Sequence, residues 1–480
     1  MSSGDAGGMT TVIVIALATR WVVGGATHDG RHRGASTNSL ASAATHTERE
    51  LPPGPRASAR SHPTMSQAHA LPGPAARVVV TGVGLVTALG IDAPSTWDGL
   101  VSGRSGVTSI SGFDTEGDKV GVAAEVKPEQ ARALAERLSA EVRGRTERFV
   151  HFACAAAREA LSSAGQPHRE RPTRFGVFAG VGIGVPHPSA GYRVGPSSII
   201  RVMPNGAAAW ISILERLQGP SLAASTACAS GAHAIGLAFD QIRLGRVTGM
   251  VAGGVDTVIT RDVLRAYAWM RALNTAKDEP PSAMSRPFDA TRRGFVLGEG
   301  AGFLVLEALD HARARGAPIL AEMRGWGASS DAHGIVSIAP GGEGMARAMH
   351  AALADARLAA DAVDYVSAHG TSTKMNDREE TRAIRQVFGR HAERLQVSSQ
   401  KSMLGHAMGG AGAIEAAVTV LCIGHQTVTP TINLHHTDPE CDLDYVPHVA
   451  RKTRIRAALS NSFGFGGHNS TLAFSHPEVT

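Results

Sequence analysis

The sequence predicts a layered α/β fold, and three observations support this prediction. Of the 480 residues, 43% are hydrophobic and 19% are charged, which is the balance of an ordinary globular protein. Short apolar runs alternate along the chain with longer stretches of helical character, as in proteins that pack helices on a central sheet. The chain also contains 55 glycines, which indicates a closely packed backbone with many tight turns.

The expected strands are the apolar runs, beginning with Val78–Val80, which leads into a predicted glycine turn at Thr81–Gly84. The other runs lie at 175–178, 221–224, 250–254, 302–306, 365–368, 396–398, 457–460 and 470–474. Helical stretches lie between them at 149–164, 229–244, 345–354, 377–388 and 410–423. Both halves of the chain share a plan of strand, glycine turn and helix. We therefore expect two domains of duplicated plan, at residues 77–324 and 325–477.

Residues 1–76 are rich in small, polar and proline residues and lack periodicity, so we expect a disordered or non-native extension. Its apolar run, Val12–Ala18, is shorter than the roughly 20 residues that span a membrane. A secretory signal has a Lys or Arg before its apolar run, and none precedes this one. We expect a cytoplasmic protein without a membrane span. Organellar import through residues 1–64 is the alternative, because this stretch resembles an Arg- and Ser-rich transit peptide.

Charge and cysteine content exclude several kinds of function. The net charge of +5 is too small for a dedicated nucleic-acid-binding protein, which needs a concentrated basic face. The glycine turns contain neither a complete G-x-G-x-x-G fingerprint nor a P-loop, so we expect no nucleotide cofactor. No C-x-x-C spacing occurs, which argues against a disulfide framework and a structural metal site among the four cysteines, Cys154, Cys228, Cys422 and Cys441.

Cys228 is the first candidate for a catalytic residue. An apolar segment leads straight into this cysteine, its neighbours are small, and a predicted helix follows at once. Small neighbours let a substrate approach the sulfur, and the start of a helix stabilises a thiolate. The segment is therefore typical of an activated nucleophile. A buried structural cysteine is the alternative, and this segment alone leaves it open.

Three further segments carry candidate site residues. His369 follows a predicted strand and lies between Ala and Gly, which would present its ring to a cleft. His406 lies in a glycine-rich loop that opens a predicted helix, preceded by Lys401 and followed by Glu415. In the motif NSFGFGGHN, glycines flank Phe465 and would free its ring and its backbone N–H. Each His alone is more often an ordinary hydrogen-bonded residue, but two such settings together with the cysteine favour catalysis.

Together these motifs resemble those of the β-ketoacyl-[acyl-carrier-protein] synthases of the elongating type, often called synthase II. The resemblance runs from Arg77 to about Phe474, with the motifs in the expected order. It rests on the Cys228 segment, AHGTST at 368–373, KSMLGH at 401–406 and NSFGFGGHN at 461–469. Supporting stretches are RVVVTGVG at 77–84, SRPFDATRRGFVLGEGAG at 285–302 and PTINLHHTDPECDLDYVP at 430–447. The resemblance implies a thiolase-like, layered αβαβα fold with two pseudo-duplicated halves.

The resemblance also implies a role for each catalytic candidate. Cys228 is similar to the nucleophile that becomes acylated in this family. His369 and His406 are similar to the two histidines that act on the malonyl group. Lys401 resembles the lysine near the site, where it would organise charge together with Glu415.

Further residues resemble the family's substrate-binding groups. Thr371 and Thr373 are similar to the threonines that hold the phosphopantetheine arm. Phe465 resembles a gating phenylalanine, with Phe463 beside it, and Ile183 falls where a residue limiting acyl length is expected. The implied oxyanion hole consists of the backbone N–H groups of the catalytic cysteine and of Phe465.

The implied partner is an acyl carrier protein, which is expected to be acidic. Arg143, Arg145 and Arg148 form a candidate docking face, although a solvated charge run is the alternative. Two departures from the family pattern are Arg293, which replaces an acidic residue, and Lys374, which replaces a proline. The family normally forms homodimers, so we expect one here.

The implied reaction is a decarboxylative Claisen condensation of malonyl-carrier with an acyl-enzyme thioester in fatty-acid elongation. It needs no metal or redox cofactor, since the substrates are carried on the phosphopantetheine of the carrier protein. A ketosynthase of a type II polyketide or other specialised acyl pathway uses the same chemistry and is the alternative. A non-catalytic partner subunit of a condensing heterodimer is less favoured, because Cys228, His369 and His406 are all present.

Overall fold

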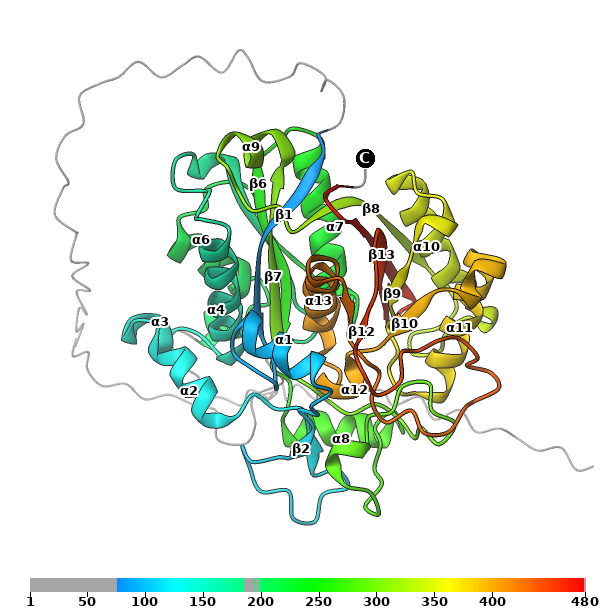
Figure 1. Cartoon of the computed structure of the whole chain (residues 1–480). Helices are drawn as coiled ribbons and strands as arrows, with labels where there is room; N and C mark the ends of the chain where they lie inside the picture. The colour runs from blue at the N-terminus through cyan, green and yellow to red at the C-terminus, as the bar shows by residue number, and fades with distance from the viewer. Residues whose placement is uncertain (1–75, 185–194, 196–197, 479–480) are drawn as a thin grey trace, which may run out of the picture. The chain divides into compact units, whose positions relative to one another are not determined.

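The computed structural model describes residues 76–184, 195 and 198–478, and ten strands within these ranges pair in one mixed sheet (Figure 1). From the centre outward one half runs β1-β7-β6-β4-β5, and the other repeats it as β8-β14-β13-β9-β10. In each half the first two pairings are antiparallel and the last two parallel. The halves join where β1 pairs with β8. The strands are β1 Val78–Val86, β4 Phe175–Gly180, β5 Ser221–Ala224, β6 Gly249–Asp256, β7 Gly300–Ala308, β8 Ala321–Ser330, β9 Tyr365–Ser367, β10 Gln396–Ser398, β13 Ala457–Gly464 and β14 His468–Ser475.

The predicted layered α/β fold with two similar halves is confirmed, and the observed strands match the apolar runs of the sequence. β1 is longer than expected, because it continues through Thr81–Gly84, where a turn is predicted. β8 has no counterpart among the predicted strands, since glycines and charged residues interrupt its sequence, AEMRGWGASS. The expected division at residue 324 falls inside this strand. The extension expected at 1–76 lies outside the described residues, apart from Ala76.

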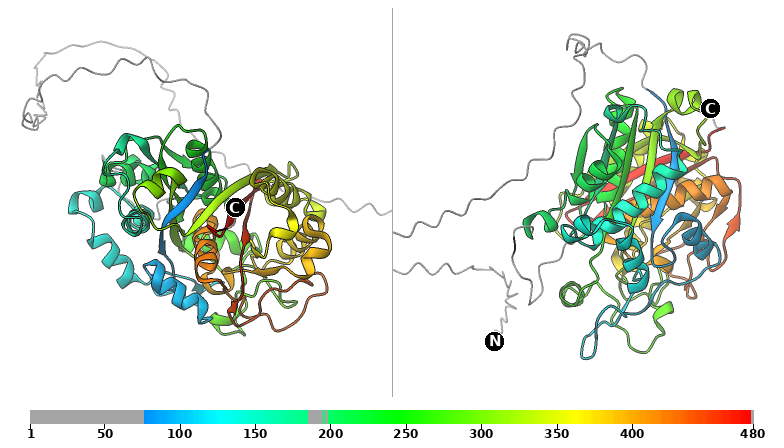
Figure 2. Two further views of the ribbon diagram at one scale, coloured as in Figure 1. Left: turned by 45° about the horizontal axis from the view of Figure 1, so that its top comes forward. Right: turned by 90° about the vertical axis from the view of Figure 1, so that its left-hand side faces the viewer.

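Helices cover the half-sheets in the layer order αβαβα (Figures 1 and 2). On one outer side, α4 Arg148–Ser163 packs on β1 and β7. On the other, α10 Glu343–Ala356 packs on β8 and β14, with α11 Lys374–Phe388 beside it. The middle layer consists of α7 Ser230–Arg243 and α13 Ala411–His425, which contact strands of both halves.

The remaining elements lie in the connections between these layers. The other α-helices are α1 Ala93–Val101, α2 Pro128–Glu136, α3 Ala140–Gly144, α5 Ser198–Val202, α6 Gly206–Glu215, α8 Arg261–Trp269, α9 Leu309–Ala314 and α12 Lys401–Leu404. Two small antiparallel pairs join β2 Thr108–Ser109 with β3 Val122–Ala123 and β11 Thr427–Val428 with β12 Arg451–Lys452. The 3-10 turns are η1 Pro172–Arg174, η2 Pro281–Ala283, η3 Pro340–Gly342, η4 Ala360–Ala362, η5 Gly389–Glu393 and η6 Met408–Gly410.

α13 is apolar around most of its surface, with Glu415 as its one charged residue, which explains its place in the middle layer. Every residue from Ala411 to Val420 is buried. Within the described ranges, Met408–His425 is the one helical stretch long and apolar enough to cross a membrane, and 83% of it is buried inside the protein. A helix buried to this extent is typical of the core of a folded domain.

Two glycines of β1 let α4 approach the sheet closely. A Cβ atom at Gly84 would lie 1.9 Å from the carbonyl oxygen of Ala156, and one at Gly82 would lie 2.1 Å from that of Ala160. Both distances are shorter than real Cβ contacts. The Gly82-x-Gly84 pattern therefore serves the packing of a helix on a strand and forms no turn.

We predict that Gly84→Ala lowers the free energy of unfolding by about 1 to 3 kcal/mol, the usual cost of overpacking a core. The added methyl group would push α4 away from β1. Gly424→Ala is the matched control, because Gly424 lies in α13 and a Cβ atom there meets nothing within 4 Å. The control should hold or slightly raise stability. Urea-unfolding midpoints measure the difference, and equal midpoints for the two variants would contradict this account of α4 packing.

Candidate active site

Three of the candidate residues follow strands of the main sheet. Cys228 lies between β5 and α7, His369 follows β9, and Lys401 begins α12 just after β10. β5, β9 and β10 all belong to the parallel parts of the sheet. The carboxyl ends of parallel strands are where ligand sites of open α/β sheets usually lie.

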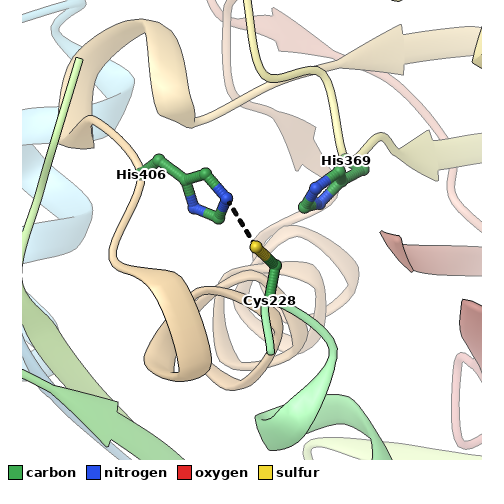
Figure 3. Close-up of side chains that lie close together, drawn as sticks. All are labelled: Cys228, His369 and His406. Atoms are coloured by element: carbon green, nitrogen blue, oxygen red, sulfur yellow. Dashed lines mark hydrogen bonds between the residues drawn. The ribbon is translucent and has the colours of Figure 1, made fainter. Parts of the chain in front are cut away.

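Two histidines flank the sulfur of Cys228 (Figure 3). Nε2 of His406 lies 3.1 Å from Sγ of Cys228, and one ring nitrogen of each histidine and the sulfur all lie within 4.8 Å of one another. The rings of His369 and His406 are nearly perpendicular, at 84°, with centroids 5.3 Å apart. All three side chains line a cavity of about 760 Å³. The structure therefore brings together the three residues that the sequence motifs single out.

The turn that carries Cys228 is tight and strained. Ser230 closes it, since its hydroxyl accepts the N–H of Thr226 at 2.8 Å and donates to the carbonyl of Ala227 at 2.6 Å. Ala227 has a φ of +50°, which non-glycine residues rarely adopt. Strained backbone of this kind is often found at active sites.

The protonation state of Cys228 differs from the sequence-based expectation of a thiolate stabilised by a helix start. Burial raises the pKa of the thiol to about 11, although the charge of Lys401 and the backbone N–H groups of Phe465 and Cys228 act in the opposite direction. The resting group at neutral pH is therefore a protonated thiol. The expectation was wrong because it weighed the helix start and not the desolvation that the surrounding layers impose.

Both histidines are neutral at physiological pH. Burial holds the pKa of His369 and of His406 well below the ordinary value, and the nearby charge of Lys401 lowers both further. A neutral imidazole has one nitrogen that donates and one that accepts a hydrogen bond. Each ring can therefore either accept a proton from the thiol or donate to an oxygen of a substrate.

Lys401 decides which nitrogen of His369 carries the proton. Its buried ammonium donates to the carbonyl oxygen of His369 at 2.7 Å and to Nδ1 of the same residue at 3.3 Å, and it pairs with Glu415. Since an ammonium has no acceptor, Nδ1 must accept, and the proton of His369 stays on Nε2. Burial raises the pKa of Glu415 to about 7, and the charge of Lys401 opposes this shift.

Glu380 is a functional residue that the sequence analysis missed. It lies on α11, fully buried, and its two carboxylate oxygens accept the backbone N–H groups of His369 and Gly370, both at 2.8 Å. Burial raises its pKa to about 7. The carboxylate fixes the loop that presents His369. A glutamate within a charged helical stretch carries no local signal of such a role.

The loop between β13 and β14 lies against the nucleophile. The backbone N–H of Phe465 lowers the pKa of the Cys228 thiol, and the ring of Phe463 packs edge-on against His369 with centroids 5.9 Å apart. A Cβ atom at Gly464 would lie 2.7 Å from the carbonyl oxygen of Thr226. Both N–H groups of the expected oxyanion hole are near enough to the sulfur to lower the pKa of the thiol, and the close approach of this loop requires glycine at position 464.

The two candidate arm-binding threonines line the same cavity. The hydroxyls of Thr371 and Thr373 lie 2.9 Å apart, and Thr373 also caps α11. Arg292, which is 1% exposed, holds this segment by donating to the carbonyl oxygens of Thr373 and Lys374, both at 3.1 Å. Arg292 is a second positioning residue that the motifs do not reveal.

The structure places the remaining candidates away from the cavity wall. Ile183 is 37% exposed and does not line the cavity; its N–H is held by Asp256. Arg148 bonds to the buried carboxylate of Glu299. Arg143 donates to a backbone carbonyl and Arg145 pairs with its helix neighbour. Within the described residues, the exposed cations that do line the cavity are Arg271, Arg293 and Lys374.

Cys228, His369 and His406 are also of the residue types that bind zinc. In the described part of the chain they are the one group of three or more His, Cys, Asp or Glu side chains close enough to share a metal ion. Lys401 works against metal binding, because it leaves Nε2 of His369 as an N–H group without a free lone pair. The expectation that no metal is bound stays a prediction.

We predict that the alkylation rate of Cys228 rises about tenfold per pH unit from about pH 7 to pH 10, because the thiolate reacts and its pKa is about 11. Intact-mass measurement after exposure to iodoacetamide gives the rate. Cys228→Ala corrects for the other cysteines. A rate that levels off below about pH 8 would show a resting thiolate and contradict the burial argument.

Two protein-family models match the chain, one over each half. Residues 75–312 match the model of the β-ketoacyl synthase N-terminal domain, and residues 320–435 match that of the β-ketoacyl synthase C-terminal domain. The 3-oxoacyl-[acyl-carrier-protein] synthase 2 of Synechocystis sp. is 44% identical over 83% of this chain and 97% of its own length.

Solved structures agree with this match. A β-ketoacyl synthase from Burkholderia phymatum has a TM-score of 0.77 and 37% identity, and the match covers 84% of this chain and 99% of that one. A type II polyketide ketosynthase, in complex with its acyl-carrier protein and bound to the hexaketide, has a TM-score of 0.74 and 32% identity, covering 84% and 100%. The chain belongs to the β-ketoacyl synthase family.

Proposed function

We propose that this protein is a β-ketoacyl-[acyl-carrier-protein] synthase that elongates fatty acids by condensing malonyl-carrier with an acyl chain held on Cys228. The observation that carries the proposal is the convergence of one sulfur and two neutral imidazoles at the wall of one cavity. A thiol accepts an acyl group from a thioester, and neutral imidazoles donate hydrogen bonds to developing oxyanions.

In the first step the sulfur of Cys228 attacks the carbonyl carbon of an acyl-carrier thioester. The thiol must lose its proton as the bond forms, and Nε2 of His406, 3.1 Å away, accepts it. The N–H groups of Cys228 and Phe465 stabilise the oxyanion. The carrier's thiol then departs with this proton, and the acyl group stays on Cys228.

In the second step malonyl-carrier enters and loses CO₂, so that an enolate forms without a strong base. The Nε2–H group of His369 donates a hydrogen bond to the malonyl thioester oxygen, where negative charge develops. The enolate carbon attacks the carbonyl carbon of the Cys228 thioester, and the sulfur leaves as a thiolate that takes up one proton from solvent. The β-ketoacyl chain leaves on the carrier. Two successive half-reactions make the kinetics ping-pong.

The thiol, the two imidazoles and the backbone N–H groups of the chain are sufficient for each of these steps. We therefore propose a reaction without a metal or redox cofactor. The substrates arrive on the phosphopantetheine arm of the carrier. The hydroxyls of Thr371 and Thr373, which line the cavity, are placed to hold that arm.

We further propose that an acidic carrier protein docks at the cavity mouth. Three exposed cations from separate segments line the cavity there: Arg271 after α8, Arg293 before β7, and Lys374 at the start of α11. Opposite charges steer two proteins together and fix their orientation. The polyketide relative solved in complex with its acyl-carrier protein supports this part of the proposal.

A homodimer joined through β5 completes the proposed assembly. β5 is the last strand of the sheet among the described residues, and its Ser221 and Leu222 are exposed. An exposed edge strand has unpaired backbone N–H and C=O groups and promotes aggregation. Pairing with the same strand of a second copy would satisfy these groups. Location in the cytoplasm stays a prediction from the sequence.

A second candidate function is elongation in a type II polyketide or other specialised acyl pathway. The likeness to a polyketide ketosynthase favours it, since the same site would perform the same chemistry. Product analysis with defined acyl carriers separates the two pathways. A non-catalytic partner subunit is disfavoured by the intact Cys228, His369 and His406.

We predict that incubation with acyl-carrier adds one acyl mass to the protein and that Cys228→Ala abolishes the adduct. His369→Ala should keep the adduct but lower the condensation rate by about 10²- to 10³-fold, the usual cost of one oxyanion donor. The exposed His436 is the control, and His436→Ala should behave like the wild type. An adduct that survives Cys228→Ala would favour the partner-subunit interpretation.

We predict that Arg271→Glu raises KM for acyl-carrier by about tenfold or more without a comparable change for a carrier-free acyl-pantetheine, since only the docking charge is reversed. Arg145→Glu is the matched variant, because Arg145 is exposed but lies outside the cavity lining. A rise in KM with Arg145→Glu and none with Arg271→Glu would instead support the docking face at Arg143, Arg145 and Arg148.

A further inference from the structure

A fully buried carboxylate lies between two backbone segments beside the nucleophile. Asp256 is the last residue of β6 and has no exposed surface. One carboxylate oxygen accepts the N–H of Gly184 at 2.8 Å, and the other accepts the N–H of Gly409 at 2.7 Å. The N–H groups of Gly182 and Ile183 donate to the same carboxylate at 3.1 and 3.2 Å. Asp256 thus joins the segment that follows β4 to the 3-10 turn η6.

Asp256 carries a negative charge at neutral pH. Burial raises its pKa to about 6, and the backbone N–H groups act in the opposite direction. The side chain is therefore a carboxylate at pH 7 and above, with two oxygens that accept hydrogen bonds and none that donates. Its charge raises the pKa of Cys228 and of Tyr267, the two ionisable groups that face it, and both are neutral at pH 7. Hydrogen bonds to a charged group are about twice as strong as those between neutral groups.

The two segments that Asp256 joins touch through their backbones. A Cβ atom at Gly409 would lie 2.1 Å from the backbone nitrogen of Gly182, and one at Gly182 would lie 2.7 Å from an oxygen of Asp256. Both distances are shorter than real Cβ contacts. Met408, just before Gly409, has a φ of +46°, which residues with a side chain rarely adopt. The carboxylate therefore holds this loop in a close and strained arrangement.

These contacts lie between the nucleophile and the histidine that accepts its proton. Gly409 is three residues after His406. A Cβ atom at Gly231, in the first turn of α7 after Cys228, would lie 3.0 Å from the carbonyl oxygen of Gly409. On its other side, the backbone of His406 pairs with residues 296–298. The His406 loop is therefore fixed at two places, and the carboxylate provides the one that lies against the start of α7.

We propose that Asp256 is a positioning residue for the acylation of Cys228, because it holds the His406 loop where Nε2 can accept the proton of the thiol. The inference rests on the proposed condensing function. The sulfur and Nε2 lie 3.1 Å apart. A displacement of about 1 Å in such a contact can lower a rate by about 10²-fold. A carboxylate of the first half would thereby set the position of a base that the second half supplies.

The test is Asp256→Asn, which keeps the size of the side chain but leaves one acceptor oxygen in place of two. The amide NH₂ group then faces backbone N–H groups, so one of the two segments is released. Acylation of Cys228 by acyl-carrier, followed by intact mass, should slow by about 10- to 100-fold. Transfer from the completed acyl-enzyme to malonyl-carrier uses His369 and should slow far less. An unchanged acylation rate, or equal slowing of both steps, would overturn the proposal.

The pH profile of acylation reports whether the proton acceptor has been displaced. In the wild type, neutral His406 accepts the proton of a neutral thiol, so the rate should be nearly constant from about pH 7 to pH 9. Without a placed acceptor, attack needs a thiolate formed beforehand, so the Asp256→Asn rate should rise about tenfold per pH unit. A rate that is low but constant would show a defect unrelated to His406 and count against the proposal.

Glu159→Gln is the matched control, since Glu159 also accepts two backbone N–H groups, those of Leu85 and Ala93, at 2.9 and 2.7 Å. This glutamate lies outside the cavity lining, so the acylation rate and its pH profile should equal those of the wild type.

Hydrogen exchange in the wild type gives a result even if Asp256→Asn does not fold. Slow exchange of the N–H groups of Gly184 and Gly409 supports the proposal, and fast exchange overturns it. If the wild-type Cys228 is not acylated by any acyl-carrier, the proposed function fails. If Asp256→Asn is acylated as fast as the wild type, only the role of Asp256 fails.

Discussion

The buried contact of Lys401 with His369 is the interaction on which the rest of the site depends. Lys401 is 2% exposed, and its ammonium bonds both the carbonyl oxygen and Nδ1 of His369. A buried charge without a partner would be very costly, and Glu415 on α13 offsets that cost. One side chain thus ties α12, α13 and the loop after β9 together and sets the tautomer of the catalytic ring.

Burial then decides the charge of the reacting groups. It raises the pKa of the Cys228 thiol and lowers those of His369 and His406, so all three are neutral at rest. A neutral site accepts an apolar acyl chain without having to desolvate an ion. The proton that attack must release has a neighbouring nitrogen to receive it, because Nε2 of His406 lies 3.1 Å from the sulfur.

The two halves share a topology but contribute different chemistry. The first half supplies the nucleophile after β5, whereas the second supplies His369 after β9 and Lys401 after β10. Neither half alone supplies both the sulfur and an imidazole of the candidate active site. The helices of the middle layer, α7 and α13, contact strands of both halves. They therefore fix the position of Cys228 relative to His369 and Lys401.

Local sequence determined every strand of the main sheet except β8, the five helices of the layers (α4, α7, α10, α11 and α13), and the segments that present Cys228, His369 and His406, because strand patterns, glycine turns and small neighbours are short-range properties. Only the tertiary structure decided what depends on residues far apart in the chain. Glu380 fixes the His369 loop from another helix, and Arg148 pairs with Glu299 rather than standing free. The neutral state of Cys228 has the same origin, since the layers that desolvate the thiol come from both halves and no single segment records their combined effect.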